Sequence, residues 1–254
     1  MLTREQIKHF HEEGYVLVPN ILSPQQVEEL RAFFRPKFKK GERRLPGDTS
    51  VIRFDVYNRY PEVRWLLFHE ASMSALRSLL GENYAVLRDT TAQLNHFGNW
   101  HKDTTTQEIF GYVFHKEVDY LMVDVAYYLQ DNSSEFGGGL DVEPGSHRRP
   151  DPFLKLRNKQ RNEPVKDFVS IPNKAGDLLI FDFRINHRGS RPQRLAAARK
   201  RGKLGLFLAC SKNNAHVGAY HEFINRRPDF GFLKNFSHDP ELLRQAQIVG
   251  LNVV

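Results

Sequence analysis

The 254-residue chain contains a single cysteine, Cys210, and lacks any apolar run long enough to form a membrane-spanning helix. One cysteine excludes an internal disulfide and any zinc site built from cysteine ligands. The residues from Thr3 onward are polar and do not resemble a signal peptide. These absences predict a protein of the reducing cytoplasm that does not enter a membrane.

Internal repeats, low-complexity stretches and linker-like segments are also missing from the chain. Hydrophobic residues make up 40% of the sequence and aromatic residues 12%, which is ordinary for a globular protein with a large core. We therefore expect one domain spanning residues 1–254. Nothing in the sequence indicates an oligomeric state.

The chain is basic, with a net charge of +7 and a pI near 9.5. Basic residues concentrate in three segments, 35–44, 155–161 and 188–203. They are interpreted either as a solvated basic surface or as a docking region for an anionic substrate, free or linked to a carrier. The absence of RNA-recognition, zinc-finger and basic-zipper patterns argues against nucleic acid as a partner.

Two kinds of local pattern predict the secondary structure. Capping boxes and terminal glycines predict helices at residues 3–13, 23–34, 70–80 and 240–249. Short apolar runs separated by turn residues predict strands at 15–18, 51–57, 84–88, 92–96, 120–130, 139–142, 168–171, 178–183 and 203–210. This spacing favours a mainly β sandwich or barrel with flanking helices over a parallel α/β sheet.

A histidine and an aspartate two residues apart, His101 and Asp103, form the first candidate site. On an extended strand they point to the same side, and together they supply two of the three ligands of a 2-His-1-carboxylate iron site. His187, which follows the apolar strand 178–183, is the candidate second histidine. From context alone it is either a ligand or a histidine bonded to the backbone. His147, beside a Pro-Gly turn, is interpreted as structural.

An arginine at the entrance to the last apolar strand, Arg201, is the candidate anchor for an acidic cosubstrate. Its planar guanidinium suits two-point bonding to a carboxylate such as the distal one of 2-oxoglutarate. Arg199 is the alternative on the same segment, and either arginine is also compatible with an ordinary surface charge.

Several short motifs occur in a fixed order along the chain. They are Phe10, Gly14 and Tyr15 near the start, His101-x-Asp103, Gly138-Gly-Leu, Pro144-Gly-Ser-His147, Gly176-Asp177, His187 and Arg201. Over about residues 3–211 this order resembles the phytanoyl-CoA dioxygenase-like family of Fe(II)/2-oxoglutarate-dependent oxygenases. One departure is Lys102, because the residue between the paired ligands is often glutamine in that family.

The resemblance implies a double-stranded β-helix, or jelly roll, with N-terminal helices packed on one side. It implies Fe(II), 2-oxoglutarate and O₂ as cofactors, with the metal held by His101, Asp103 and His187. It further implies that Arg201, Asn95 and Tyr127 contact 2-oxoglutarate. No catalytic residue beyond the metal ligands is assigned. The carboxylate Asp103 argues against halogenation, because halogenases of this kind carry a small residue there.

The expected reaction is oxidation of a substrate C–H, most simply hydroxylation, with release of succinate and CO₂. The expected substrate is a small metabolite, and three segments are expected to shape its pocket: 37–50, 104–117 and 213–232. Two rival interpretations use the same residues, namely a nucleic-acid or protein demethylase and a catalytically inert jelly-roll binding protein. Desaturation or cyclisation would begin from the same chemistry, so the sequence does not separate these outcomes.

Overall fold

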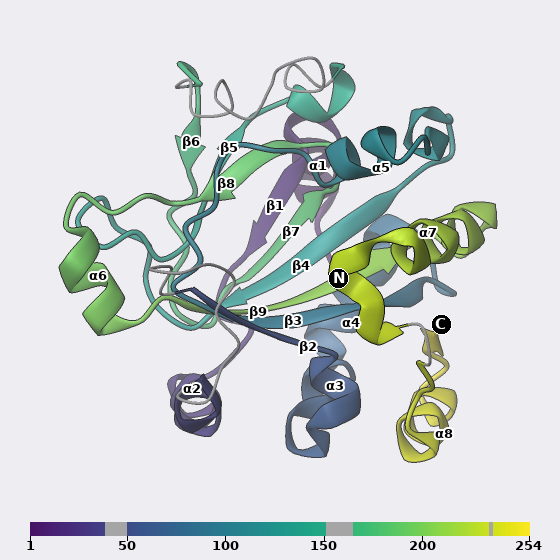
Figure 1. Cartoon of the computed structure of the whole chain (residues 1–254), viewed down its shortest axis with the longest axis horizontal. Helices are drawn as coiled ribbons and strands as arrows, with labels where there is room; N and C mark the ends of the chain where they lie inside the picture. Colours follow the sequence, from purple (N-terminus) through teal and green to yellow (C-terminus); the bar gives the residue numbers. More distant parts are fainter. Residues whose placement is uncertain (39–49, 151–164, 234–235) are drawn as a thin grey trace.

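The computed structural model describes residues 1–38, 50–150, 165–233 and 236–254. Within these residues two mainly antiparallel sheets pack face to face, and helices cover the outer face of the larger one (Figure 1). The larger sheet has the order β1-β7-β4-β9-β3-β10, with β2 paired to β3, and the smaller has the order β6-β5-β8. Only the pairing of β10 with β3 is parallel. The strands are β1 (Tyr15–Val18), β2 (Val51–Phe54), β3 (Ala85–Leu94), β4 (Met122–Tyr128), β5 (Leu140–Glu143), β6 (Val169–Ser170), β7 (Leu178–Asp182), β8 (Asn186–Gly189), β9 (Leu204–Ser211) and β10 (Asn252–Val253).

Helices of the N-terminal part, together with the last helix, support the outer face of the larger sheet (Figure 1). Four short 3₁₀ segments are described at Pro61–Leu66, Phe114–Lys116, Ser146–Arg148 and Pro228–Leu233. None of the described helices is long and apolar enough to cross a membrane. The α-helices are α1 (Arg4–Glu13), α2 (Pro24–Phe38), α3 (Val56–Arg59), α4 (Glu70–Leu80), α5 (Asp103–Ile109), α6 (Leu195–Arg201), α7 (Ala215–Arg226) and α8 (Pro240–Ile248).

The predicted N-terminal elements are confirmed, because local capping decides them. Thr3 and Gln6 exchange the two hydrogen bonds of a capping box, and Gly14 ends α1 with a positive φ of 86°.

Other secondary-structure predictions were wrong in part. The run 51–57 divides into β2 and the start of α3, and residues 84–96 form one strand, β3, rather than two. Helices α5, α6 and α7 were not predicted.

Alternation along the central strands β4 and β9 determines which residues reach the site. Val123, Val125 and Tyr127 of β4 belong to the large core beneath the sheet. Asp124 and Tyr128 point to the opposite face, toward the smaller sheet and the pocket. Likewise, Leu204, Leu206 and Leu208 of β9 are core residues, whereas Gly205 and Phe207 of β9, and Lys203 directly before it, line the pocket. The inner face of the larger sheet is therefore the floor of the site.

Candidate metal centre and adjoining pockets

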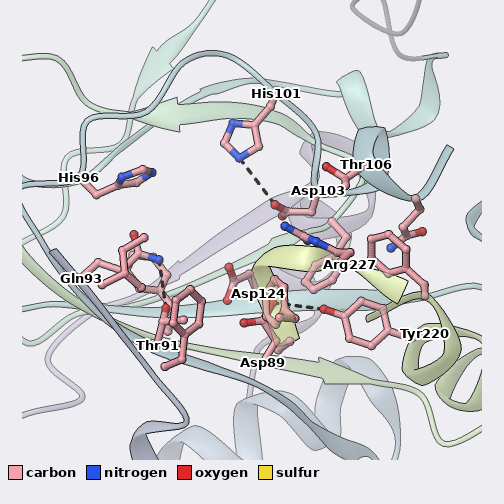
Figure 2. Close-up of a pocket in the computed structure, with 18 residues that line it drawn as sticks. Asp89, Thr91, Gln93, His96, His101, Asp103, Thr106, Asp124, Tyr220 and Arg227 are labelled. Carbon is pink, nitrogen blue, oxygen red and sulfur yellow. Dashed lines mark hydrogen bonds and ion pairs between the residues drawn. The ribbon is translucent and has the colours of Figure 1, made fainter. Parts of the chain in front are cut away.

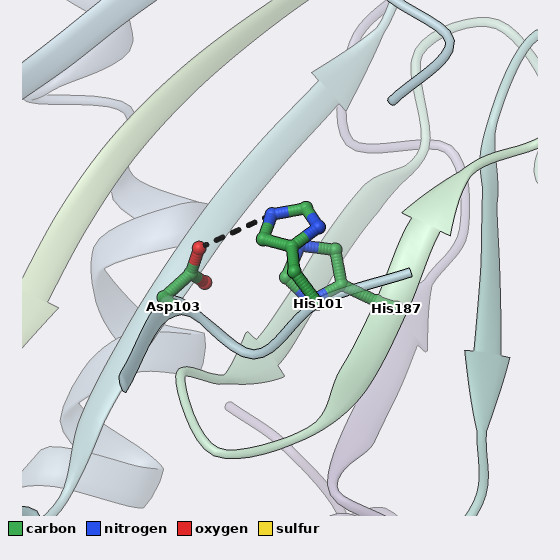
Figure 3. Close-up of side chains that lie close together, drawn as sticks. All are labelled: His101, Asp103 and His187. Atoms are coloured by element: carbon green, nitrogen blue, oxygen red, sulfur yellow. Dashed lines mark ion pairs between the residues drawn. The ribbon is translucent and has the colours of Figure 1, made fainter. Parts of the chain in front are cut away.

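The backbones of the two histidines, 86 positions apart in sequence, form an isolated antiparallel bridge. His101 N–H donates to the His187 carbonyl at 3.0 Å, and His187 N–H donates to the His101 carbonyl at 2.9 Å. The ring centroids lie 4.3 Å apart, and Asp103 approaches the same point (Figure 3). One ligand atom from each of the three residues can be chosen so that all lie within 4.8 Å of one another. The three residues predicted as ligands are thus brought together.

Asp103 reaches this point by a different backbone route from the one predicted. It is the first residue of α5 rather than part of an extended strand, and its N–H donates to the Phe183 carbonyl at 3.0 Å. The extended backbone assumed in pairing these two residues therefore does not reach Asp103. Extended backbone continues only to Lys102, and the turn into the helix directs the Asp103 carboxylate toward His101 Nε2, at 3.7 Å.

Hydrogen bonds fix which nitrogen of each imidazole faces the cluster. Nδ1 of His101 lies 2.7 Å from the Asn99 carbonyl, and Nδ1 of His187 lies 3.1 Å from the Ile185 carbonyl. A carbonyl only accepts, so each Nδ1 carries a proton, and each Nε2 is the nitrogen left to face the cluster. Metal-bound histidines show this arrangement, in which the outer hydrogen bond orients the ligand.

The electrostatics of the cluster fit a divalent cation. Burial and the neighbouring His101 hold the pKa of His187 well below its usual value, so its imidazole is neutral. Burial also raises the pKa of Asp103, and the Oδ2 atom is buried without a hydrogen-bond partner among the described residues. The neutral imidazole of His187, the imidazole of His101 and one under-satisfied carboxylate form the donor set of non-haem Fe(II).

Two neighbouring residues have structural roles. Lys102 points away from the cluster, and its buried ammonium donates to the carbonyls of Ser146 and Arg149, at 2.6 Å each. It thereby ties the segment between the ligands to the loop after β5. His147 lies outside the cluster, with Nε2 3.1 Å from the His11 carbonyl, as expected for a structural histidine.

Two adjoining compartments share the ligand cluster. The larger, a cavity of about 270 Å³, is open to His101 and Asp103 (Figure 2). The smaller, about 100 Å³, is also lined by His187. Their shared lining residues are Gln93, His96, His101, Asp103, Asp124 and Phe207. This division suits a cosubstrate bound in one compartment and a substrate bound in the other.

Lys203 is the basic residue that lines the smaller compartment in the described part of the chain. Its ammonium is buried and donates to the Gly139 carbonyl at 2.8 Å. Burial lowers its pKa to about 7. A β-carbon added at Gly189 would lie 2.7 Å from the Lys203 Nζ, so a glycine there leaves room around the amine. A buried amine beside this candidate metal centre suits the distal carboxylate of a dicarboxylate.

The residues predicted to contact 2-oxoglutarate lie outside both compartments. Arg201 is exposed at the end of α6, with its guanidinium 4.8 Å from the centre of the Phe136 ring. Arg199 and Asn95 line a separate surface pocket, where the Asn95 amide bonds the Arg199 carbonyl. Tyr127 is fully buried in the core beneath the sheet.

The alternation of side chains along β4 and β9 explains why Tyr127 lies outside the compartments and why Lys203 and Tyr128 line the smaller one. This alternation can be read from the sequence. The core residues Leu204, Leu206 and Leu208 fix the outward face of β9, so Lys203 must face inward. Similarly, Val123 and Val125 place Tyr127 in the core and Tyr128 in the pocket. For Asn95 alternation fails, because its φ of 56° turns the chain after the end of β3.

The larger compartment differs from the anion-binding pocket suggested by the net charge. Its charged lining residues in the described part of the chain are three aspartates, Asp89, Asp103 and Asp124, and one arginine, Arg227. Two of the predicted pocket segments, 104–117 and 213–232, do line it. Most of segment 37–50 and all of the basic cluster 155–161 lie outside the described residues.

Comparison with known proteins places the chain among oxygenases. The sequence matches the phytanoyl-CoA dioxygenase (PhyH) family over residues 10–199. An ectoine dioxygenase from Nocardia farcinica is 24% identical over 220 residues, covering 72% of this chain and 70% of that protein. The α-ketoglutarate-dependent carbocyclase SnoK from nogalamycin biosynthesis has a TM-score of 0.64 at 18% identity, covering 86% of this chain and 90% of its own. HygX from Streptomyces hygroscopicus, solved with nickel and 2-oxoglutarate, has a TM-score of 0.60 at 14% identity, with coverages of 84% and 88%. The predicted jelly-roll fold is confirmed.

Proposed function

The chain belongs to the phytanoyl-CoA dioxygenase family and is an Fe(II)/2-oxoglutarate-dependent dioxygenase, and on this premise we propose that it hydroxylates an unactivated C–H bond of a small metabolite. The observation that carries the proposal is the convergence of His101, Asp103 and His187 between two compartments. We assign the iron to these three residues. When bound, the iron couples decarboxylation of 2-oxoglutarate by O₂ to oxidation of the substrate.

The smaller compartment is assigned to 2-oxoglutarate. Lys203 holds the distal carboxylate by a charge-assisted hydrogen bond, and the Tyr128 side chain lines the same space. The 2-oxo acid end is then directed toward the ligand cluster, at the mouth of the larger compartment. Lys203 takes the role that the sequence assigned to Arg201.

The larger compartment is assigned to the substrate. Aromatic side chains from β2, α7 and the 3₁₀ segment after it line the space beside His101 and Asp103. They exclude water from the reacting carbon and hold the substrate against the cluster, which is the protein's contribution to the rate. A cavity of about 270 Å³ suits a small metabolite rather than a carrier protein.

We further propose that residues 1–254 act as one catalytic domain, because both sheets and α5 and α7 contribute to a single site. A reducing compartment such as the cytoplasm would keep the iron ferrous. A catalytically inert binding protein would not require the Nε2 atoms of His101 and His187 to converge on an Asp103 carboxylate whose Oδ2 has no hydrogen-bond partner among the described residues. No described feature of the pocket favours the demethylase alternative over a small metabolite.

The test is a substrate screen with the complete enzyme. Protein, Fe(II), 2-oxoglutarate and O₂ are incubated with a panel of small metabolites, and succinate and mass-shifted products are measured together. Hydroxylation predicts succinate in equal amount to a product that has gained one oxygen atom. A product that has lost two hydrogens would instead identify desaturation or cyclisation and overturn the hydroxylase proposal. The exposed Asp167→Ala variant serves as the active control for Asp103→Ala.

A further inference from the structure

Two carboxylates that do not belong to the metal cluster form the floor of the larger compartment (Figure 2). Asp124 of β4 stands directly opposite Ala209 of β9, and directly opposed residues of paired strands share one face of a sheet. Asp89 comes from β3, on the other side of β9. The small Ala209 side chain between them leaves the space above the floor open.

An irregularity in β3 brings Asp89 to this face. Between the pairs Val86–Cys210 and Thr90–Leu208, three residues of β3 stand against the single residue Ala209 of β9. Such bulges disrupt the ladder and redirect a side chain beside active sites. The Tyr220 hydroxyl donates to Asp89 Oδ2 at 3.3 Å and orients the carboxylate in the cavity.

A buried amide on the wall of the same cavity is not fully bonded by the protein. Gln107 is fully buried and lines the compartment one turn beyond Asp103 on α5. Its side chain interacts with the Tyr120 hydroxyl, but neither its Nε2 nor its Oε1 meets full hydrogen-bond geometry with a described group. A buried amide is destabilising when its hydrogen bonds are incomplete, so Gln107 is placed to bond a ligand as well.

The rest of the wall is aromatic. Phe54, Phe183, Phe207, Tyr220, Phe223 and Phe230 line the cavity. The faces of such rings attract cations, whereas they offer nothing to an anion. A cavity with carboxylates on its floor and aromatic rings on its walls is typical of a binding site for an organic cation.

A count of formal charges favours the same ligand. In the loaded site Fe(II) and Lys203 bring three positive charges, which Asp103 and the 2-oxoglutarate dianion balance. Asp89 and Asp124 then face one basic lining residue of the described chain, Arg227. Among the described lining residues this leaves one negative charge in excess. A single positive charge on the substrate balances the compartment.

We propose that the substrate carries a cationic nitrogen, as an amine, amidine or guanidine, which binds between Asp124 and Asp89 while Gln107 bonds an adjacent polar group. This inference rests on the proposed function, because it names the substrate class of the same site. It replaces the anionic substrate suggested by the net charge of the chain.

The test compares matched probes in ligand-observed NMR titrations. Butylammonium and butylguanidinium are the cations, pentanamide is the neutral probe, and pentanoate is the anion. Each is titrated into the anaerobic complex with Fe(II) and 2-oxoglutarate, and into the metal-free protein. The variants are Asp124→Asn, Asp89→Asn and, as a charge-matched control outside the pocket, the exposed Glu222→Gln of α7.

We expect both cations to bind at least about tenfold more tightly than pentanamide or pentanoate, as one charge-assisted hydrogen bond predicts. Asp124→Asn should remove most of this preference, and Glu222→Gln should keep it. Equal binding of the four probes by the wild-type protein, or no detectable binding of either cation, overturns the proposal even if a variant fails to fold.

The two proposals fail in different ways in this experiment. Loss of Fe(II) and 2-oxoglutarate binding with an intact cation preference would refute the oxygenase site and leave the cation subsite standing. Normal binding of Fe(II) and 2-oxoglutarate without a cation preference would refute the subsite alone.

Discussion

His101 and His187 donate their backbone N–H groups to each other's carbonyls, at 3.0 and 2.9 Å, so main-chain geometry fixes the two imidazoles that we propose as metal ligands. Each imidazole is then oriented by a hydrogen bond from Nδ1 to a second backbone carbonyl. The cluster is therefore arranged before a metal binds, and binding does not need to order these side chains.

Removing the carboxylate ligand should abolish turnover while leaving the fold intact. Asp103→Ala deletes one of the three proposed ligands, and it also removes a buried carboxylate whose Oδ2 has no hydrogen-bond partner among the described residues. We expect substrate-dependent succinate formation to fall more than ~100-fold, with unchanged circular dichroism. Asp167→Ala, at an exposed position, should retain wild-type activity. Turnover near the wild-type level in Asp103→Ala would refute the ligand assignment.

The anchor for 2-oxoglutarate should be Lys203 and neither nearby arginine. Lys203→Met keeps the length of the buried chain but removes its charge, so the dissociation constant for 2-oxoglutarate should rise about 10- to 100-fold. Arg201→Met and Arg199→Met should change it less than about threefold, since both arginines line other pockets or the surface. Calorimetric titration of the metal-loaded protein measures all three. A larger effect from either arginine would restore the assignment made from the sequence.

Adjacent tyrosines of β4 should affect different properties. Tyr128 lines the smaller compartment, so Tyr128→Phe should raise the apparent KM for 2-oxoglutarate and leave stability nearly unchanged. Tyr127 is in the core and is hydrogen-bonded to Ser72, so Tyr127→Phe should lower the free energy of unfolding by about 1 kcal/mol without changing that KM. Steady-state kinetics and urea unfolding distinguish the two, and exchanged phenotypes would mean that the register of β4 is wrong.

The buried Lys203 should make the stability of the metal-free protein depend on pH. Its pKa is about 7 in the folded state, against an ordinary value of 10.5. Between these values the unfolded chain binds more protons than the folded one, so the free energy of unfolding rises with pH through this window. Below pH 7 the cost of the buried charge is fully present, and Lys203→Met should be the more stable protein. Urea unfolding from pH 7 to about 10 should show this advantage shrinking, whereas a constant difference would contradict the assignment.

The sequence predicts the ligands better than it predicts the pocket, for identifiable reasons. His101, Asp103 and His187 carry their chemistry in residue type and order, so their convergence could be predicted even though Asp103 begins a helix and not a strand. Tyr128 differs from the predicted Tyr127 only in which face of β4 it occupies, and alternation with the core valines could have identified it. Alternation with the leucines of β9 likewise predicts that Lys203 faces inward, but it could not exclude Arg201, which lies at the end of α6 and not on a strand. Asp89 and Gln107 could not be found in this way. A bulge redirects the first, and the second lies on a helix that no sequence pattern predicted.

The central claim is that three named side chains bind the iron, and anaerobic Fe(II) titration with metal analysis tests it most directly. The wild-type protein should bind one Fe(II) per chain, His187→Ala and Asp103→Ala should bind none at the same concentration, and His147→Ala should bind as the wild type does. Unchanged iron binding in His187→Ala, or loss of iron in His147→Ala, would contradict the account.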